Sequence, residues 1–92
     1  MSDRYEKPAS PASLGLTLRQ GDVLALVLRG LSNKRIALTL NLSESTVKEH
    51  MTGIFQRLGV SNRINAITFM RGRRFTVVSQ HDVAHHDHAM NA

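Results

Sequence analysis

The run from residue 43 to residue 59 constrains the fold most, because it has the pattern of one long two-faced helix. Its apolar side chains recur at helical spacing and form a single seam: Val47, Met51, Ile54 and Leu58. The opposite face is polar and carries no large apolar side chain: Ser45, Lys48, Glu49, Thr52 and Gln56. Ser43 is a good N-cap, and Gly59 suits the left-handed residue beyond a helix end. The pattern predicts a helix with a buried seam and a polar face.

Two shorter helices are predicted ahead of it. The first begins at Thr17, which forms a capping box with Gln20, and ends before Gly30. The second is capped by Ser32 and ends at Asn41, because asparagine tolerates the positive φ of a tight turn.

A fourth helix is predicted from an N-cap at Ser61 to about Arg71 or Gly72. One of its faces is expected in the core, with Ala66, Ile67 and Met70, and a neighbouring face carries Ile64 and Thr68. No alternation typical of strands is visible. We therefore expect an all-α fold, a four-helix domain over residues 14–75.

The two ends of the chain have a different composition. Residues 1–13 are rich in Pro, Ala and Ser and have the composition of a flexible linker or lead. Residues 76–92 form a polar tail that holds four of the five histidines: His81, His85, His86 and His88. Their spacing suits metal binding if the tail is helical, but the tail has little apolar surface to hold a helix in place. We expect two flexible tails, no metal site and no cofactor.

Charge indicates the kind of partner. Residues 14–75 hold ten basic and three acidic side chains, a net charge of +7, although the whole chain carries +5. This excess favours a polyanion, either nucleic acid or an anionic membrane. A membrane is disfavoured because 71–75 is too short for a basic amphipathic anchor, and 23–28 is too short to span a bilayer.

Several other classes of protein are also disfavoured. The chain has no cysteine, and residues 1–13 lack the apolar core of a signal peptide, so we expect a cytoplasmic protein. No nucleophile, base and orienting group occur at workable spacing, and no phosphate-binding glycine loop is present. The chain is therefore not expected to be an enzyme.

The second and third predicted helices have the spacing of a helix-turn-helix. Ala37 allows close helix crossing, Asn41 follows in the turn, and Val47 supplies the buried aliphatic side chain of the next helix. The polar face of the third helix would then enter the major groove of DNA. On periodicity alone, a helical bundle with a solvated polar face is an equally good interpretation.

Four short motifs resemble those of one protein family. LT-x-R-Q, GLSNK-x-IA, LS-x-x-TVK-x-H and LGV-x-x-R occur in order within residues 16–67. The run is similar to the LuxR-type (GerE/FixJ/NarL-like) DNA-binding domain of bacterial transcription regulators. The resemblance implies a four-helix domain that binds duplex DNA and commonly pairs through its fourth helix. It also gives His50 and Arg63 structural roles.

The candidate DNA contacts follow from position on these helices. The base-contacting candidates on the polar face of the third helix are Lys48, Glu49 and Thr52. The phosphate-contacting candidates near helix N-termini or further along the third helix are Asn33, Lys34, Thr46, Gln56 and Arg57.

The exposed side of the fourth predicted helix indicates how the domain assembles on DNA. An exposed Ile64, with Thr68, suggests a homodimer through the fourth helix on an inverted repeat of double-stranded DNA. We expect sequence-specific duplex-DNA binding by the output domain of a bacterial transcription regulator. The alternative is a protein-interaction module that docks on RNA polymerase or another regulator.

The run departs from the family pattern at a few positions. Arg35 stands where the family usually has Glu, and it adds positive charge near the groove edge. Gly21 and Gly53 lie inside predicted helices, where each costs about 1 kcal/mol relative to Ala. Gly53 is interpreted either as a site of close approach or as a tolerated weak position.

Overall fold

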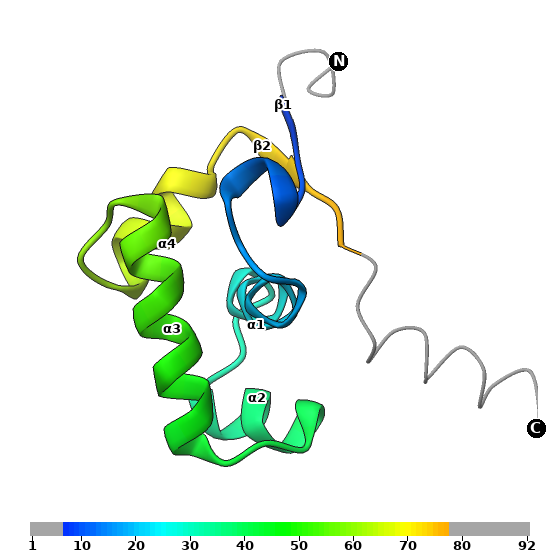
Figure 1. Cartoon of the computed structure of the whole chain (residues 1–92), viewed down its shortest axis with the longest axis vertical. Coiled ribbons are helices and arrows are strands. Elements are labelled where there is room, and N and C mark those ends of the chain that lie inside the picture. The colour runs from blue at the N-terminus through cyan, green and yellow to red at the C-terminus, as the bar shows by residue number, and fades with distance from the viewer. Residues whose placement is uncertain (1–6, 78–92) are drawn as a thin grey trace, which may run out of the picture.

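The longest helix, α3 (Glu44–Leu58), contacts each of the other three helices. The computed structural model describes residues 7–77. In Figure 1, α1 (Leu18–Leu28) is seen end-on beside α3, and α2 (Asn33–Leu40) lies near the N-terminal end of α3. The chain then turns back into α4 (Arg63–Met70), which packs on α3 and α1. The predicted all-α fold with four helices is confirmed.

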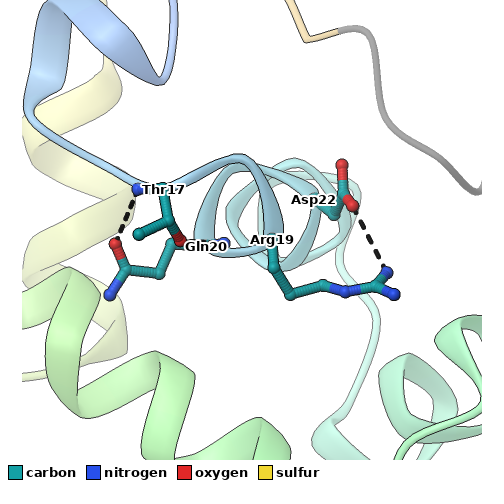
Figure 2. Close-up of polar contacts among 4 residues, drawn as sticks. All are labelled: Thr17, Arg19, Gln20 and Asp22. Atoms are coloured by element: carbon teal, nitrogen blue, oxygen red, sulfur yellow. Dashed lines mark hydrogen bonds and ion pairs between the residues drawn. The ribbon is translucent and has the colours of Figure 1, made fainter.

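The predicted ends of the first three helices are confirmed by their hydrogen bonds. The Gln20 backbone N–H donates to Thr17 Oγ1 at 3.0 Å, and the Thr17 N–H donates to Gln20 Oε1 at 2.9 Å (Figure 2). The Oγ of Ser32 accepts from the Arg35 N–H at 3.2 Å and the Oγ of Ser43 accepts from the Thr46 N–H at 3.1 Å, so each serine caps its helix without a reciprocal bond. Asn41 ends α2 with a φ of 59°, the left-handed conformation predicted for the turn.

The fourth helix begins one residue later than predicted. Its N-cap is Asn62, whose Oδ1 accepts from the Asn65 backbone N–H at 2.8 Å, so the expectation of a Ser61 cap is wrong. Serine and asparagine have nearly equal preferences for the N-cap position. The sequence therefore does not show which of the adjacent residues, Ser61 or Asn62, caps the helix.

The core is aliphatic and is built mainly from α1, α2 and α3. The predicted seam of α3, from Val47 to Leu58, is buried along its length. The largest side chains that are almost completely buried are Leu24, Ile36, Ile54, Val23, Val27 and Val47. Because this core fixes which side of α3 faces inward, it also fixes which side faces solvent.

Part of the predicted lead, residues 1–13, contains secondary structure that the sequence pattern did not indicate. Strand β1 (Lys7–Ala9) pairs in parallel with strand β2 (Arg73–Phe75), and the Thr76 N–H donates to the Ala9 carbonyl at 2.9 Å. A short 3-10 turn, η2 (Ala12–Leu14), then leads towards α1. Strands of three residues are too short to produce a recognisable alternation, which is why the sequence pattern did not indicate them.

Some sequence predictions concern residues outside the described range. Residues 1–6 and 78–92, with the tail histidines His81, His85, His86 and His88, lie there. Within residues 7–77, no helix is long and apolar enough to cross a bilayer. The same stretch has no group of three or more His, Asp or Glu side chains placed to hold a metal ion.

Candidate nucleic-acid interface

Helices α2 and α3 are joined by the tight turn that the sequence predicts for a helix-turn-helix. The Leu42 N–H donates to the Ala37 carbonyl at 2.9 Å, and Asn41 supplies the left-handed residue between the helices. Ala37 and Val47 are both buried where α2 contacts α3. The three positions that suggested the motif therefore have the roles expected of them.

The face of α3 opposite its buried seam is open to solvent. Its exposed side chains include the three predicted base contacts and one predicted phosphate contact: Lys48, Glu49, Thr52 and Gln56. The Thr52 hydroxyl donates to the Lys48 carbonyl at 3.1 Å, so its methyl group and oxygen lone pairs are held in one orientation. This face is polar, accessible and carried on a rigid helix.

One groove brings several of the predicted contacts together. It runs between the N-terminus of α2, the side of α3 and the start of α4. Its lining includes Asn33, Lys48 and Thr52, together with Met51, Phe55, Ser61, Asn62 and Arg63. Asn33, a predicted phosphate contact on α2, thus lies beside Lys48 and Thr52, the two predicted base contacts of α3 in this groove.

Arg63 forms the structural anchor that the family resemblance implied. Its Nη1 donates to the Leu31 carbonyl at 2.9 Å, and its Nη2 donates to Asn33 Oδ1. The first residue of α4 is thereby tied to the loop before α2 and to the first residue of α2. This link to Asn33 was not predicted, since no local signal connects positions 30 residues apart.

The remaining predicted phosphate contacts do not line this groove. Lys34 is exposed and lines a second groove, which shares Asn33 and Arg63 with the first. Thr46 is half-buried and its Oγ1 accepts from the hydroxyl of the N-cap Ser43 at 2.9 Å.

Arg57 is not brought together with Lys48. Nine residues separate the two, about two and a half helical turns, so they lie on opposite flanks of α3. The Cδ of Arg57 lies 3.8 Å from the position that a Cβ on Gly15 would occupy, near the entrance to α1. The nine-residue spacing in the sequence is enough to predict this separation.

An apolar stripe is exposed on α4. Ile64 is 73% exposed, as predicted, and Thr68 is exposed one turn later. Ile67 was expected in the core with Ala66 and Met70, but it is 37% exposed and lies on the outer side of the helix. Ile64, Ile67 and Thr68 follow at i, i+3 and i+4, so they share one face.

Surface charge is strongly positive. Residues 7–77 contain eleven basic and three acidic side chains. Of these acids, Asp22 is buried and pairs with Arg19 at 3.3 Å (Figure 2), while Glu44 and Glu49 lie exposed on α3. Such a surface attracts polyanions.

Comparison with known proteins finds bacterial regulators that match this helix-turn-helix region. The chain is 48% identical over 59 residues to the nitrate/nitrite response regulator protein NarP of Escherichia coli (strain K12), which covers 63% of this chain and 27% of NarP. It is 43% identical over 65 residues to the transcriptional activator protein VanR of Vibrio anguillarum, covering 71% of this chain and 27% of VanR.

The match to these relatives is limited to one part of them. The glycerol metabolism activator of Pseudomonas putida is 46% identical over 52 residues, 56% of this chain and 24% of that protein. The chain thus spans about a quarter of the length of each of these three relatives. No solved structure gives a significant match. Residues 14–70 match the family described as bacterial regulatory proteins, luxR family. With its helix-turn-helix and the exposed polar face of α3, the chain belongs to the luxR family of DNA-binding transcription regulators.

Proposed function

We propose that this domain binds double-stranded DNA sequence-specifically, with α3 in the major groove. The observation that carries the proposal is the exposed polar face of α3, set opposite a buried seam and joined to α2 by a helix-turn-helix turn. The major groove of B-DNA accepts a helix of this kind, and its base edges are read by polar side chains.

The exposed side chains of α3 have the chemistry for reading base edges. Lys48 is a donor suited to guanine O6 and N7, and Glu49 is an acceptor suited to cytosine N4. Thr52 presents a methyl group and a hydroxyl whose orientation is fixed by its bond to the Lys48 carbonyl. We assign base contacts to these three residues.

The phosphate contacts are assigned to polar groups around this face. Asn33 and Lys34 begin α2 and Thr46 lies in the first turn of α3, where helix N-termini favour anions. Gln56 is further along the exposed face of α3. Arg57, on the other flank of α3, is assigned to a phosphate beyond the reach of Lys48.

We further propose that two copies pair through α4 on an inverted repeat. Exposed Ile64 and Ile67, with Thr68, form a small apolar face that a second copy can cover. Pairing about a two-fold axis places the two α3 helices in successive major grooves, about 10 base pairs apart.

The names of the relatives suggest the biological role. NarP is named a response regulator, and VanR a transcriptional activator. We propose that this chain is likewise the DNA-binding output domain of a bacterial transcription regulator, acting in the cytoplasm.

Selection of binding sites from random duplex DNA tests the proposal. The protein is titrated on the selected pool at two salt concentrations, because phosphate contacts make affinity fall steeply with salt. We expect enrichment of an inverted repeat and a steep salt dependence. Failure to enrich any sequence, with salt-insensitive capture of RNA polymerase instead, would favour the protein-interaction alternative.

A further inference from the structure

The contact between Arg63 and Asn33 joins a structural anchor to a residue of the proposed DNA interface. Arg63 is half-buried at the start of α4, and its two terminal nitrogens reach the Leu31 carbonyl and Asn33 Oδ1. Asn33 is also half-buried, is the first residue of α2 and lines the groove that contains Lys48 and Thr52.

The chemistry of the two side chains fixes how the Asn33 amide is turned. A guanidinium group carries only hydrogen-bond donors, so the atom of Asn33 that faces it must be the carbonyl oxygen. The NH2 group then points away from Arg63. Within residues 7–77 this NH2 group donates to no protein acceptor. Asn33 therefore presents an oriented donor beside the N-terminus of α2, where the helix dipole favours an anion.

We propose that Arg63 is a positioning residue, which holds the Asn33 amide so that its NH2 group donates to a DNA backbone phosphate next to the base-reading face of α3. This inference rests on the proposed function, since the phosphate belongs to the bound duplex. Two of the five N–H donors of Arg63 bind acceptors within the domain, and in this proposal Arg63 acts through Asn33 and does not itself neutralise a phosphate.

Replacing Asn33 separates this role from a purely structural one. Asn33→Asp keeps an acceptor for Arg63, gives it an ion-pair partner and places a negative charge in the first turn of α2. We expect an unchanged or higher melting temperature, while duplex binding weakens by more than tenfold because a donor has been exchanged for a carboxylate.

Asn62→Asp is the matched control for the added charge. Asn62 lines the same groove, and aspartate caps a helix about as well as asparagine, so α4 keeps its cap. We expect Asn62→Asp to weaken binding less than Asn33→Asp. Equal losses for the two variants would mean that charge alone matters and would overturn the inference.

A double-mutant cycle tests whether Arg63 acts through Asn33. Asn33→Ala is expected to weaken binding to specific and random duplexes alike, by about ten- to a hundredfold, the usual range for a hydrogen bond to a charged group. Arg63→Ala should cause a similar loss in the wild-type background and little further loss in the Asn33→Ala background. Neither change should alter the slope of log affinity against log salt concentration, since neither removes a neutralised phosphate.

The results of these experiments distinguish failure of the positioning role from failure of the proposed DNA binding. Equal losses from Arg63→Ala in both backgrounds, or a smaller salt slope, would show that Arg63 contacts DNA directly and would overturn the positioning role. Wild-type affinity in Asn33→Ala would overturn the inference while leaving DNA binding intact. If the wild-type domain binds no duplex, the proposed function fails and this inference fails with it. Should Arg63→Ala not fold, the comparison of Asn33→Asp with Asn62→Asp still tests the phosphate contact of Asn33, and Arg63→Lys, which keeps a donor and the charge, replaces Arg63→Ala in the cycle.

Discussion

Pro11 packs against Gly21 so closely that no side chain fits between them. A Cβ placed on Gly21 would lie 2.5 Å from Pro11 Cγ and 3.0 Å from Pro11 Cβ. Both residues are buried, one in the segment before α1 and the other inside α1. The close approach explains why a helix interior carries a glycine here despite its poor helix propensity.

Gly21→Ala is therefore expected to destabilise the domain. Alanine favours the helix by about 1 kcal/mol, but the clash with a rigid, buried proline ring outweighs this gain, and overpacking of this kind costs about 1–3 kcal/mol. A net loss of about 1 kcal/mol should lower the melting temperature by about 4–8 °C, measured by circular dichroism. Adding Pro11→Ala removes the nearest clashing atom and should recover part of the loss. A Gly21→Ala variant that is more stable than the wild type would contradict this packing.

Gly53→Ala has a different expected result because its neighbour can move. A Cβ on Gly53 would clash with Gln20 Nε2, the end of the side chain whose oxygen caps α1. Displacing Gln20 weakens that capping bond, worth about 0.5–1.5 kcal/mol, and this offsets the helix-propensity gain of about 1 kcal/mol. We expect little net change in unfolding free energy from chemical denaturation. In a Gln20→Ala background the same substitution should stabilise the domain by about 1 kcal/mol, and equal effects in both backgrounds would disprove the coupling.

Gly21 and Gly53 illustrate which features of the fold the sequence could not predict. Helix positions followed from local signals, such as the Thr17–Gln20 capping box and the seam of α3. The contacts that need a glycine join segments distant in the chain, so their partners have no local signature. The β1–β2 pairing also joins distant segments, and its three-residue strands are too short to show an alternation. Ile67 was misplaced because α4 carries apolar residues on more than one face.

The candidate site also has one part that the sequence could predict and one part that it could not. The exposed face of α3 with Lys48 could be predicted, because a buried seam at helical spacing fixes the opposite face. The groove that places Asn33 next to that face depends on how α2 and α4 pack on α3. The bond from Arg63 to Asn33 is part of that packing, and a pattern within one helix contains no information about it.

Lys48→Ala tests the proposed base contact. If Lys48 reads a guanine, specific binding should weaken by about 1–3 kcal/mol and discrimination at one base pair should relax. The measurement is titration of the selected site and of its single-base variants. An equal loss of affinity for specific and random duplexes would show that Lys48 contacts a phosphate and not a base.

Lys34→Ala is the matched comparison, because this lysine is also exposed but lies at the N-terminal end of α2. Loss of a phosphate contact should weaken binding uniformly across sequences. It should also reduce the slope of log affinity against log salt concentration by about one unit. A slope equal to that of the wild type would show that Lys34 neutralises no phosphate.

Ile64→Glu tests pairing through α4. The Ile64 side chain is 73% exposed, so a polar replacement removes little buried apolar surface, and the melting temperature should stay close to the wild-type value. In a two-fold contact, residues at the axis face their own copies, so the two introduced carboxylates would repel each other and lie next to apolar Ile67. Binding to a single half-site should be unchanged, whereas cooperative binding to the full inverted repeat should be lost.

Asn65→Glu provides the control, since it adds the same charge at an exposed position one residue further along α4, on a different face of the helix. Comparing half-site and full-site titrations for both variants separates a face-specific effect from a general repulsion of DNA. Equal loss of affinity on half-sites and full sites would indicate general repulsion, and retained cooperativity in Ile64→Glu would place the dimer contact elsewhere. The α4 face is small, so we expect free dimers to be weak and pairing to tighten on DNA, where two half-sites hold both copies at high effective concentration.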